Sequence, residues 1–274
     1  MKELKDYLKS NFTEQYSDKT ILSILYFKPK QKVEAKILVV GSEHGDKIHG
    51  TKAMIQLMHE LYKKPLEKTQ IDFIPVIDTE GYPDKRTVIG NEGLGKPLYL
   101  DSGYKTNKMP EQIKDLLDKV NPDYNLALQL NTAFKEEMPL INGYFIVPQI
   151  NKKIVEKGDE FKTQLKIDSR YKDLIGTILN SLNKNEIQLL TENDNGYLGD
   201  GHILAMPGLV LPGIEENNSF ELKTRNVFAR KCQKKEVLSL ELVTLAQKIT
   251  TEPNNEVVRA HKVALDTLVK LYEL

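Results

Sequence analysis

The chain has 274 residues, 40% of them hydrophobic, and its 39 basic side chains equal its 39 acidic ones. This composition suits a soluble protein with a substantial core, and zero net charge excludes a general positive field for holding nucleic acid. The single cysteine, Cys232, excludes an internal disulfide and a cysteine-rich zinc site, so we expect it to be buried and inert.

No targeting segment, repeat or linker is recognisable along the chain. Residues 1–16 are polar and charged, and no apolar stretch approaches the length that a membrane span requires. We therefore expect a cytoplasmic protein that binds neither membranes nor nucleic acid, folded as one domain over residues 1–274.

Strands and a helix alternate in the first part of the chain. Residues 20–27 and 33–41 predict two strands joined by a proline-containing turn, which favours an antiparallel hairpin. The unbroken apolar run at 37–40 is typical of a strand covered on both faces. A helix over 50–63 and a second buried strand over 70–78 are expected next.

The segment 79–108 shows no hydrophobic periodicity and is rich in glycine and proline. Loops of this length in compact domains are usually functional or disordered. Because this one contains Arg86 and several aromatic residues, we expect it to form the rim of a binding site.

The rest of the chain continues the alternation. We expect strands over 124–131, 143–149, 187–190 and 237–243, and helices over 110–120, 171–182 and 256–272. Residues 151–170 are highly charged and predict a surface excursion. The alternation as a whole predicts an α/β fold in which helices flank a mixed central β-sheet.

Polar residues occur where ligands bind in such sheets. The segment 41–50 joins the first central strand to its helix and contains His44 and Lys47. Ligand sites in open α/β sheets lie beyond the carboxyl ends of the strands. In the strand 237–243 three leucines alternate with Ser239 and Glu241, so Glu241 is expected on the face opposite the leucines.

Four segments, taken in this order, resemble the zinc carboxypeptidase family, including its desuccinylase and aspartoacylase branch. They are His44-Gly-Asp-Lys47 after a strand, the strand 73–81 followed by Arg86, the segment 109–131, and Ser239-Leu-Glu-Leu242. The resemblance implies the zinc-carboxypeptidase-like (phosphorylase/hydrolase-like) sandwich. It also implies a cleft lined by His44, Lys47, Arg86 and Gln129, with Glu241 at the position of the family's general base.

The family's metal ligands are only partly present. The resemblance places His44 at the first ligand position, Lys47 where the family has glutamate, and Gln129 where it has the second histidine. An ammonium group cannot coordinate zinc, and a neutral amide is a poor ligand for it. We therefore predict that the zinc site is lost and that the protein needs no cofactor. We also predict an ion pair between Lys47 and Glu241, with His44 and Gln129 hydrogen-bonded to it.

Three functions are compatible with these patterns. The first is a non-catalytic or repurposed carboxypeptidase-like protein that binds a small peptide or an amino-acid-like ligand. The second is an active metal-dependent hydrolase of peptides or N-acyl amino acids with a rearranged metal site. The third is a partner-binding α/β protein without a site at the strand edge. The metal content of the purified protein distinguishes the first function from the second. Whether the side chains of residues 44, 47, 129 and 241 meet in one pocket distinguishes the first from the third.

Overall fold

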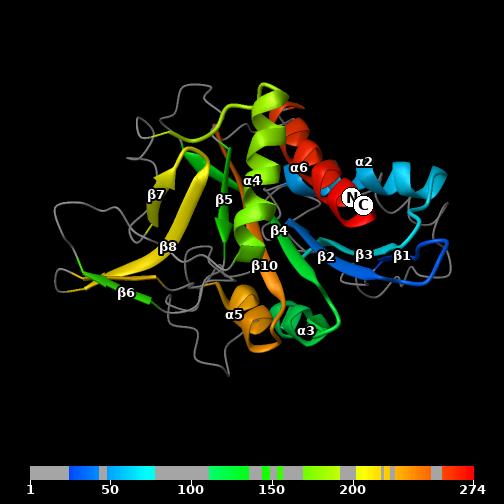
Figure 1. The fold of residues 1–274 in the computed structure, drawn as a ribbon, viewed down its shortest axis with the longest axis horizontal. Helices are drawn as coiled ribbons and strands as arrows, with labels where there is room; N and C mark the ends of the chain where they lie inside the picture. Colours follow the sequence, from blue (N-terminus) through cyan, green and yellow to red (C-terminus); the bar gives the residue numbers. More distant parts are fainter. Residues whose placement is uncertain are drawn as a thin grey trace.

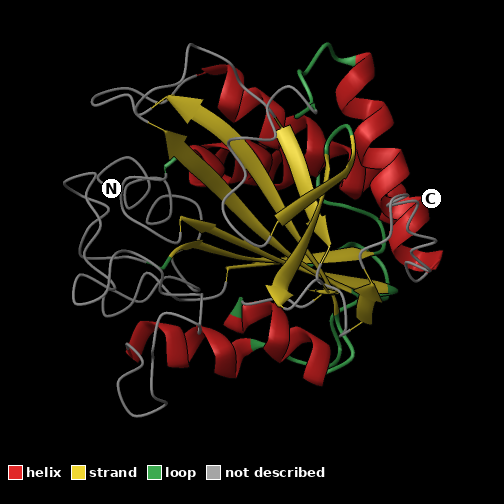
Figure 2. Cartoon of the chain, turned by 90° about the vertical axis from the view of Figure 1, so that its left-hand side faces the viewer, coloured by secondary structure: helices red, strands yellow, loops and turns green. Residues whose placement is uncertain are grey.

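The computed structural model describes residues 25–42, 48–77, 111–135, 144–148, 153–156, 169–191, 202–216, 219–222, 226–247 and 255–274. These residues form a mixed ten-stranded β-sheet with helices on both sides (Figures 1 and 2). The predicted α/β sandwich with a mixed central sheet is confirmed.

Parallel strands form the centre of the sheet, in the order β3-β2-β4-β10. Their bounds are β2 (Ala35–Ser42), β3 (Thr69–Val76), β4 (Leu126–Lys135) and β10 (Leu238–Gln247). The helix α2 (His49–Lys63) connects β2 to β3, and α3 (Glu111–Lys119) precedes β4. The apolar run at 37–40 is fully buried, as predicted, because β2 has a partner strand on each edge and helices on each face.

Outer strands extend the sheet on both sides. On one side β1 (Leu25–Phe27) pairs antiparallel with β3. On the other side β5 (Tyr144–Pro148) pairs antiparallel with β10 and is followed by β8 (Leu209–Glu216). Beyond β8 come β9 (Ser219–Leu222) and β6 (Lys153–Glu156), while β7 (His202–Met206) pairs with β8.

The predicted hairpin between residues 20–27 and 33–41 is wrong. Leu25 pairs with Phe73 of β3, and β2 lies between β3 and β4. The reason is the parallel β2–α2–β3 unit, whose crossover helix brings β3 to the edge of β2 that a hairpin partner would need.

Two further expectations need correction on the β5 side of the sheet. The strand expected over 187–190 is reduced to a single bridge between Leu189 and Tyr144. Residues 153–156 form β6, although the charged segment around them predicted only a surface excursion. Both differences from the predicted strands depend on pairing with strands that are distant in the sequence, and the local hydrophobic pattern does not indicate such pairing.

Helices form two layers around the sheet (Figure 2). On one face α2, α4 (Ser169–Lys184) and α6 (Asn255–Glu273) cover the larger hydrophobic core. On the other face α3 and α5 (Val227–Lys234) cover a smaller core that contains Cys232. Burial raises the pKa of the Cys232 thiol to about 12, so it stays protonated and inert, as expected.

Two glycines allow α2 to lie close to the strand ends. A Cβ on Gly50 would lie 2.6 Å from the Leu130 Cβ of β4, and a Cβ on Gly41 of β2 would lie 2.8 Å from the Met54 sulfur of α2. The Thr51 hydroxyl of α2 donates a hydrogen bond to the Pro75 carbonyl of β3. The first turn of α2 is thereby held against the middle of β4 and the carboxyl end of β3.

In the part of the chain that the structure describes, none of the helices has both the length and the apolar character needed to cross a bilayer.

Candidate functional site

Two of the predicted site residues, Gln129 and Glu241, lie in the described part of the chain. They are directly opposite each other on the parallel strands β4 and β10. Their side chains therefore project from the same face of the sheet, and they are only 2% and 3% exposed. His44, Lys47 and Arg86 lie outside the described residues, so the predicted Lys47–Glu241 ion pair stays a prediction.

The face on which Glu241 lies agrees with the alternation of its strand. Leu240 and Leu242 belong to the core beneath α2, α4 and α6. Glu241 projects to the other face, where Gln129 is hydrogen-bonded to Asn226, the residue before α5. The sequence prediction for the orientation of Glu241 is therefore confirmed.

Gln129 is held by Asn226, the N-cap residue immediately before α5. Its Oε1 accepts a hydrogen bond from Asn226 Nδ2 at 2.7 Å. Asn226 also caps this helix, since its Oδ1 accepts from the backbone N–H groups of Phe228 and Ala229 at 3.0 and 3.2 Å. One buried asparagine thus connects the central strand β4 to the start of a helix.

Glu241 is held by the neighbouring strand. Its Oε1 accepts a hydrogen bond from Asn131 Nδ2 at 2.7 Å, and Asn131 Oδ1 accepts from the backbone N–H of Thr132 at 2.8 Å. Asn131 is itself only 7% exposed. We refer to Gln129, Asn131, Asn226 and Glu241 as the amide cluster.

Sequence analysis missed Asn131 and Asn226 as members of this cluster. Asn131 could have been found, because residues two apart in a strand lie on the same face and Gln129 was already a candidate. Asn226 precedes the amphipathic helix α5 and is of a residue type favoured at the N-cap. Nothing local, however, indicates that this cap contacts Gln129, which is 97 residues away in the sequence.

The donor set of the amide cluster does not suit a catalytic zinc ion. Three of its four members are neutral amides, whereas zinc is held by thiolate, imidazole or carboxylate groups. Among the described residues no group of three histidine, cysteine, aspartate or glutamate side chains is placed to hold a metal ion. No catalytic step through a metal can be built on these residues.

Two buried histidines lie on the opposite face of the sheet. His49 begins α2, with its Nδ1 3.4 Å from the Thr132 hydroxyl, and that hydroxyl also accepts a hydrogen bond from Thr244 at 3.3 Å. Burial lowers the pKa of His49 to about 4.

His261 of α6 is fully buried, and its ring packs edge-on against Tyr144 at a centroid distance of 5.6 Å. Neither ring nitrogen makes a hydrogen bond of ordinary geometry within the described residues. Burial, with a smaller effect from the charge of His49, lowers its pKa to about 3, although the Asn131 backbone has a weaker opposing effect. Both rings are therefore neutral at pH 7.

Comparisons with known proteins identify solved structures that have a similar fold. No protein-family model and no curated protein sequence matches this chain. Solved structures do match it, and metallopeptidases are among them. A metallo-carboxypeptidase from Burkholderia cenocepacia aligns over 98% of this chain and 68% of its own, with a TM-score of 0.59 and 9% identity.

Two further structures agree with this assignment. The cell shape determinant Csd4 of Helicobacter pylori, solved with a bound tripeptide, has a TM-score of 0.54 and 14% identity over 91% of this chain. The match spans 55% of the Csd4 chain, about half its length. A protein assigned as a metallopeptidase from Shewanella denitrificans has a TM-score of 0.54 and 13% identity, over 97% of this chain and 90% of its own. The chain therefore has the zinc-carboxypeptidase-like fold that its sequence predicted.

Proposed function

We propose that this chain is a carboxypeptidase-like protein that has lost its catalytic zinc site and binds a small peptide or an amino-acid-like ligand at the strand edge. The observation that carries the proposal is the hydrogen bond from Asn226 to Gln129. The Gln129 Oε1, the side-chain atom through which glutamine could approach a cation, accepts from the Asn226 amide, and a neutral amide oxygen is a poor ligand for zinc.

The buried carboxylate supports the same conclusion. Glu241 stands where the resemblance to carboxypeptidases expects a general base, yet its Oε1 accepts from the Asn131 amide inside the protein. A general base must reach a water or substrate proton within hydrogen-bond distance. A carboxylate that is 3% exposed and bonded to a neighbouring strand suits a structural or ligand-orienting role better.

The remaining predicted residues complete this proposal. Lys47 would place a positive charge beside Glu241 where the family has zinc, and His44 and Arg86 would line the cleft with Gln129. Cationic and amide groups of this kind suit the carboxylate and backbone groups of a peptide. The tripeptide bound to Csd4, a structural neighbour, favours this class of ligand. We further propose that residues 1–274 form one domain, which the continuous sheet supports.

Metal analysis of the purified full chain tests the loss of zinc. We expect far less than one zinc per chain after dialysis against buffer without chelator. Retention of about one zinc per chain, lost in His44→Ala and kept in His59→Ala, would contradict the proposal and favour the active hydrolase. His59 is the matched control because it is an exposed histidine on α2.

Ligand binding is a separate test. Calorimetric titration with short peptides and free amino acids should detect a ligand whose affinity falls in Lys47→Gln and Arg86→Gln. The exposed Lys63→Gln of α2 serves as the control and should leave the affinity unchanged. Equal binding by all these variants, or none to any peptide or amino acid, would instead favour the partner-binding alternative.

A further inference from the structure

The side-chain amide of Asn226 has a fixed orientation, because it is bonded to backbone N–H groups that can only donate. Its Oδ1 accepts from Phe228 and Ala229 at 3.0 and 3.2 Å. A reversed amide would turn its own N–H groups toward these two donors. Asn226 is 1% exposed, so solvent cannot replace the hydrogen bonds that a reversal would lose. Its Nδ2 must therefore face away from the start of α5.

The orientation of Asn226 in turn fixes that of Gln129. The Asn226 Nδ2 lies 2.7 Å from Gln129, and because this nitrogen can only donate, the atom that it meets must be Oε1. The Nε2 of Gln129 then points away from Asn226, whatever else the side chain contacts. This nitrogen carries two hydrogens and cannot accept. The end of Gln129 that is turned away from Asn226 is thus a hydrogen-bond donor.

Glu241 is oriented in the same way by its neighbouring strand. The backbone N–H of Thr132 donates to Asn131 Oδ1 at 2.8 Å, which turns Asn131 Nδ2 toward Glu241 Oε1 at 2.7 Å. An ionised carboxylate accepts hydrogen bonds through both of its oxygens and donates none. Because Gln129 and Glu241 are directly opposite each other on β4 and β10, a donor and an acceptor lie side by side on one face of the sheet.

A donor beside an acceptor matches a peptide group, whose carbonyl oxygen accepts and whose N–H donates. A ligand carboxylate in the same place would be repelled by the charge of Glu241. We infer that Asn226 determines the specificity of the strand-edge site. By fixing Gln129 as a donor, it makes the site bind the carbonyl oxygen of a peptide group, with the peptide N–H directed to Glu241. Asn226 acts through Gln129 and is therefore a positioning residue.

This inference rests on the proposed function, which places Gln129 in the ligand cleft. Calorimetric titration of the full chain with dialanine and with its thioamide analogue tests it. The two molecules differ only in the peptide group, where sulfur, a weak hydrogen-bond acceptor, replaces the carbonyl oxygen. We expect the natural chain to bind dialanine about fivefold more tightly than the thioamide, which is the effect of one hydrogen bond.

Asn226→Asp reverses the polarity of the contact. Aspartate still caps α5 but cannot donate, so the Gln129 amide should turn its Nε2 toward the new carboxylate and leave its oxygen in the donor's place. We expect the preference for dialanine over the thioamide to disappear. Asn226→Ser also keeps a capping hydroxyl but introduces no buried charge, and it is too short to hold Gln129. It should lose the preference as well, and thermal melting checks that both variants are folded.

Asn180→Asp is the matched control, because it makes the same chemical change at an exposed position of α4. It should keep both the affinity for dialanine and the preference. An undiminished preference in both Asn226 variants, or equal binding of the two molecules by the natural chain, would overturn the inference and leave the proposed function standing. Absent binding of dialanine would also overturn it. The proposed function would be overturned with it only if other short peptides and amino acids also fail to bind.

Discussion

Asn131 donates a hydrogen bond to Glu241 across two neighbouring parallel strands, and both side chains are buried. The amide thus satisfies one oxygen of a carboxylate that the resemblance to carboxypeptidases would assign to catalysis. Burying a carboxyl group costs free energy of folding unless the group is hydrogen-bonded. The hydrogen bond from Asn131 therefore helps to stabilise the sheet, and it also orients Glu241 in the candidate site.

Replacing Asn131 with alanine should destabilise the protein. The change removes the hydrogen bond that Asn131 donates to the buried Glu241, and the loss of a partner by a buried acceptor typically costs about 1–3 kcal/mol. Urea unfolding followed by circular dichroism measures the free energy of unfolding. Asn180→Ala is the control, since Asn180 is an exposed asparagine on α4. Equal stability of the two variants would mean that Glu241 does not depend on this amide.

Restoring the family's ligands should restore zinc affinity. The double change Lys47→Glu and Gln129→His adds a carboxylate and an imidazole to His44, which together form a ligand set suited to catalytic zinc. Zinc titration monitored by calorimetry should show tight binding that neither single variant has. The histidine must also displace the Asn226–Gln129 hydrogen bond, so we expect some loss of stability without metal. Absence of any gain in zinc affinity would count against the alignment of these residues with the family.

The two helical glycines Gly50 and Gly176 should respond to alanine in opposite directions. A Cβ at Gly50 would lie 2.6 Å from the Leu130 Cβ, so Gly50→Ala should force α2 away from β4 and destabilise by about 1–3 kcal/mol. A Cβ at Gly176 of α4 meets nothing within 4 Å. Gly176→Ala should therefore stabilise by about 0.5–1 kcal/mol through helix propensity. Thermal melting of both variants distinguishes close packing from propensity, and destabilisation by both would contradict this explanation.

Acid should destabilise the fold through His49 and His261. Their folded-state pKa values, about 4 and about 3, lie below the ordinary value of 6.5 because both rings are buried. The unfolded chain therefore binds more protons once the pH falls below 6.5. The stability that neutral rings provide is fully present above this pH and is lost progressively toward pH 3 to 4. Each histidine should contribute a slope of about 1.4 kcal/mol per pH unit inside its window.

The variant His261→Phe isolates one of these contributions. It keeps a ring of similar size against Tyr144 but removes the titrating group. Unfolding free energies measured between pH 7 and 4 should show a smaller pH dependence than those of the natural chain. A slope in His261→Phe equal to that of the natural chain would show that this ring titrates normally in the fold.

Local sequence determined the central elements of the fold. The run at 37–40, the alternation at 237–243 and the helical periodicity at 50–63 specify their structures by spacing alone, because side-chain direction repeats every two residues in a strand and every 3.6 in a helix. The same spacing predicted the face that Glu241 occupies. These features require only neighbours along the chain, which is why they could be predicted without the fold.

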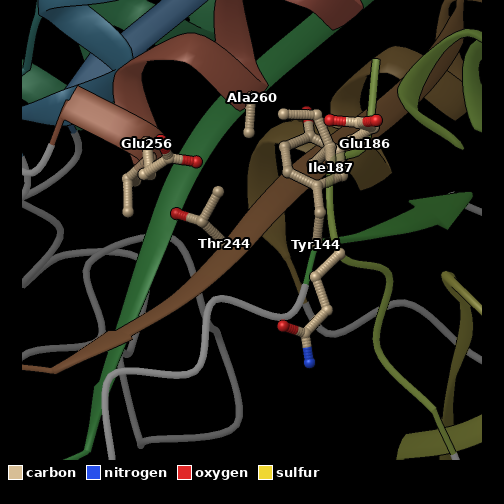
Figure 3. Close-up of a pocket in the computed structure, with 8 residues that line it drawn as sticks. Tyr144, Glu186, Ile187, Thr244, Glu256 and Ala260 are labelled. Atoms are coloured by element: carbon tan, nitrogen blue, oxygen red, sulfur yellow. The ribbon is translucent and has the colours of Figure 1, made fainter. Parts of the chain in front are cut away.

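Only the tertiary structure decided which strands are neighbours and which polar groups meet. The place of β1 beside β3 rather than β2 depends on the crossover through α2. The contacts Asn226–Gln129 and Asn131–Glu241 join residues 97 and 110 positions apart. The pocket lined by Tyr144, Ile187, Thr244 and Ala260 likewise combines four separate segments of the described chain (Figure 3). Pairing over such separations is selected by the packing of the whole core, and no local pattern in the sequence encodes it.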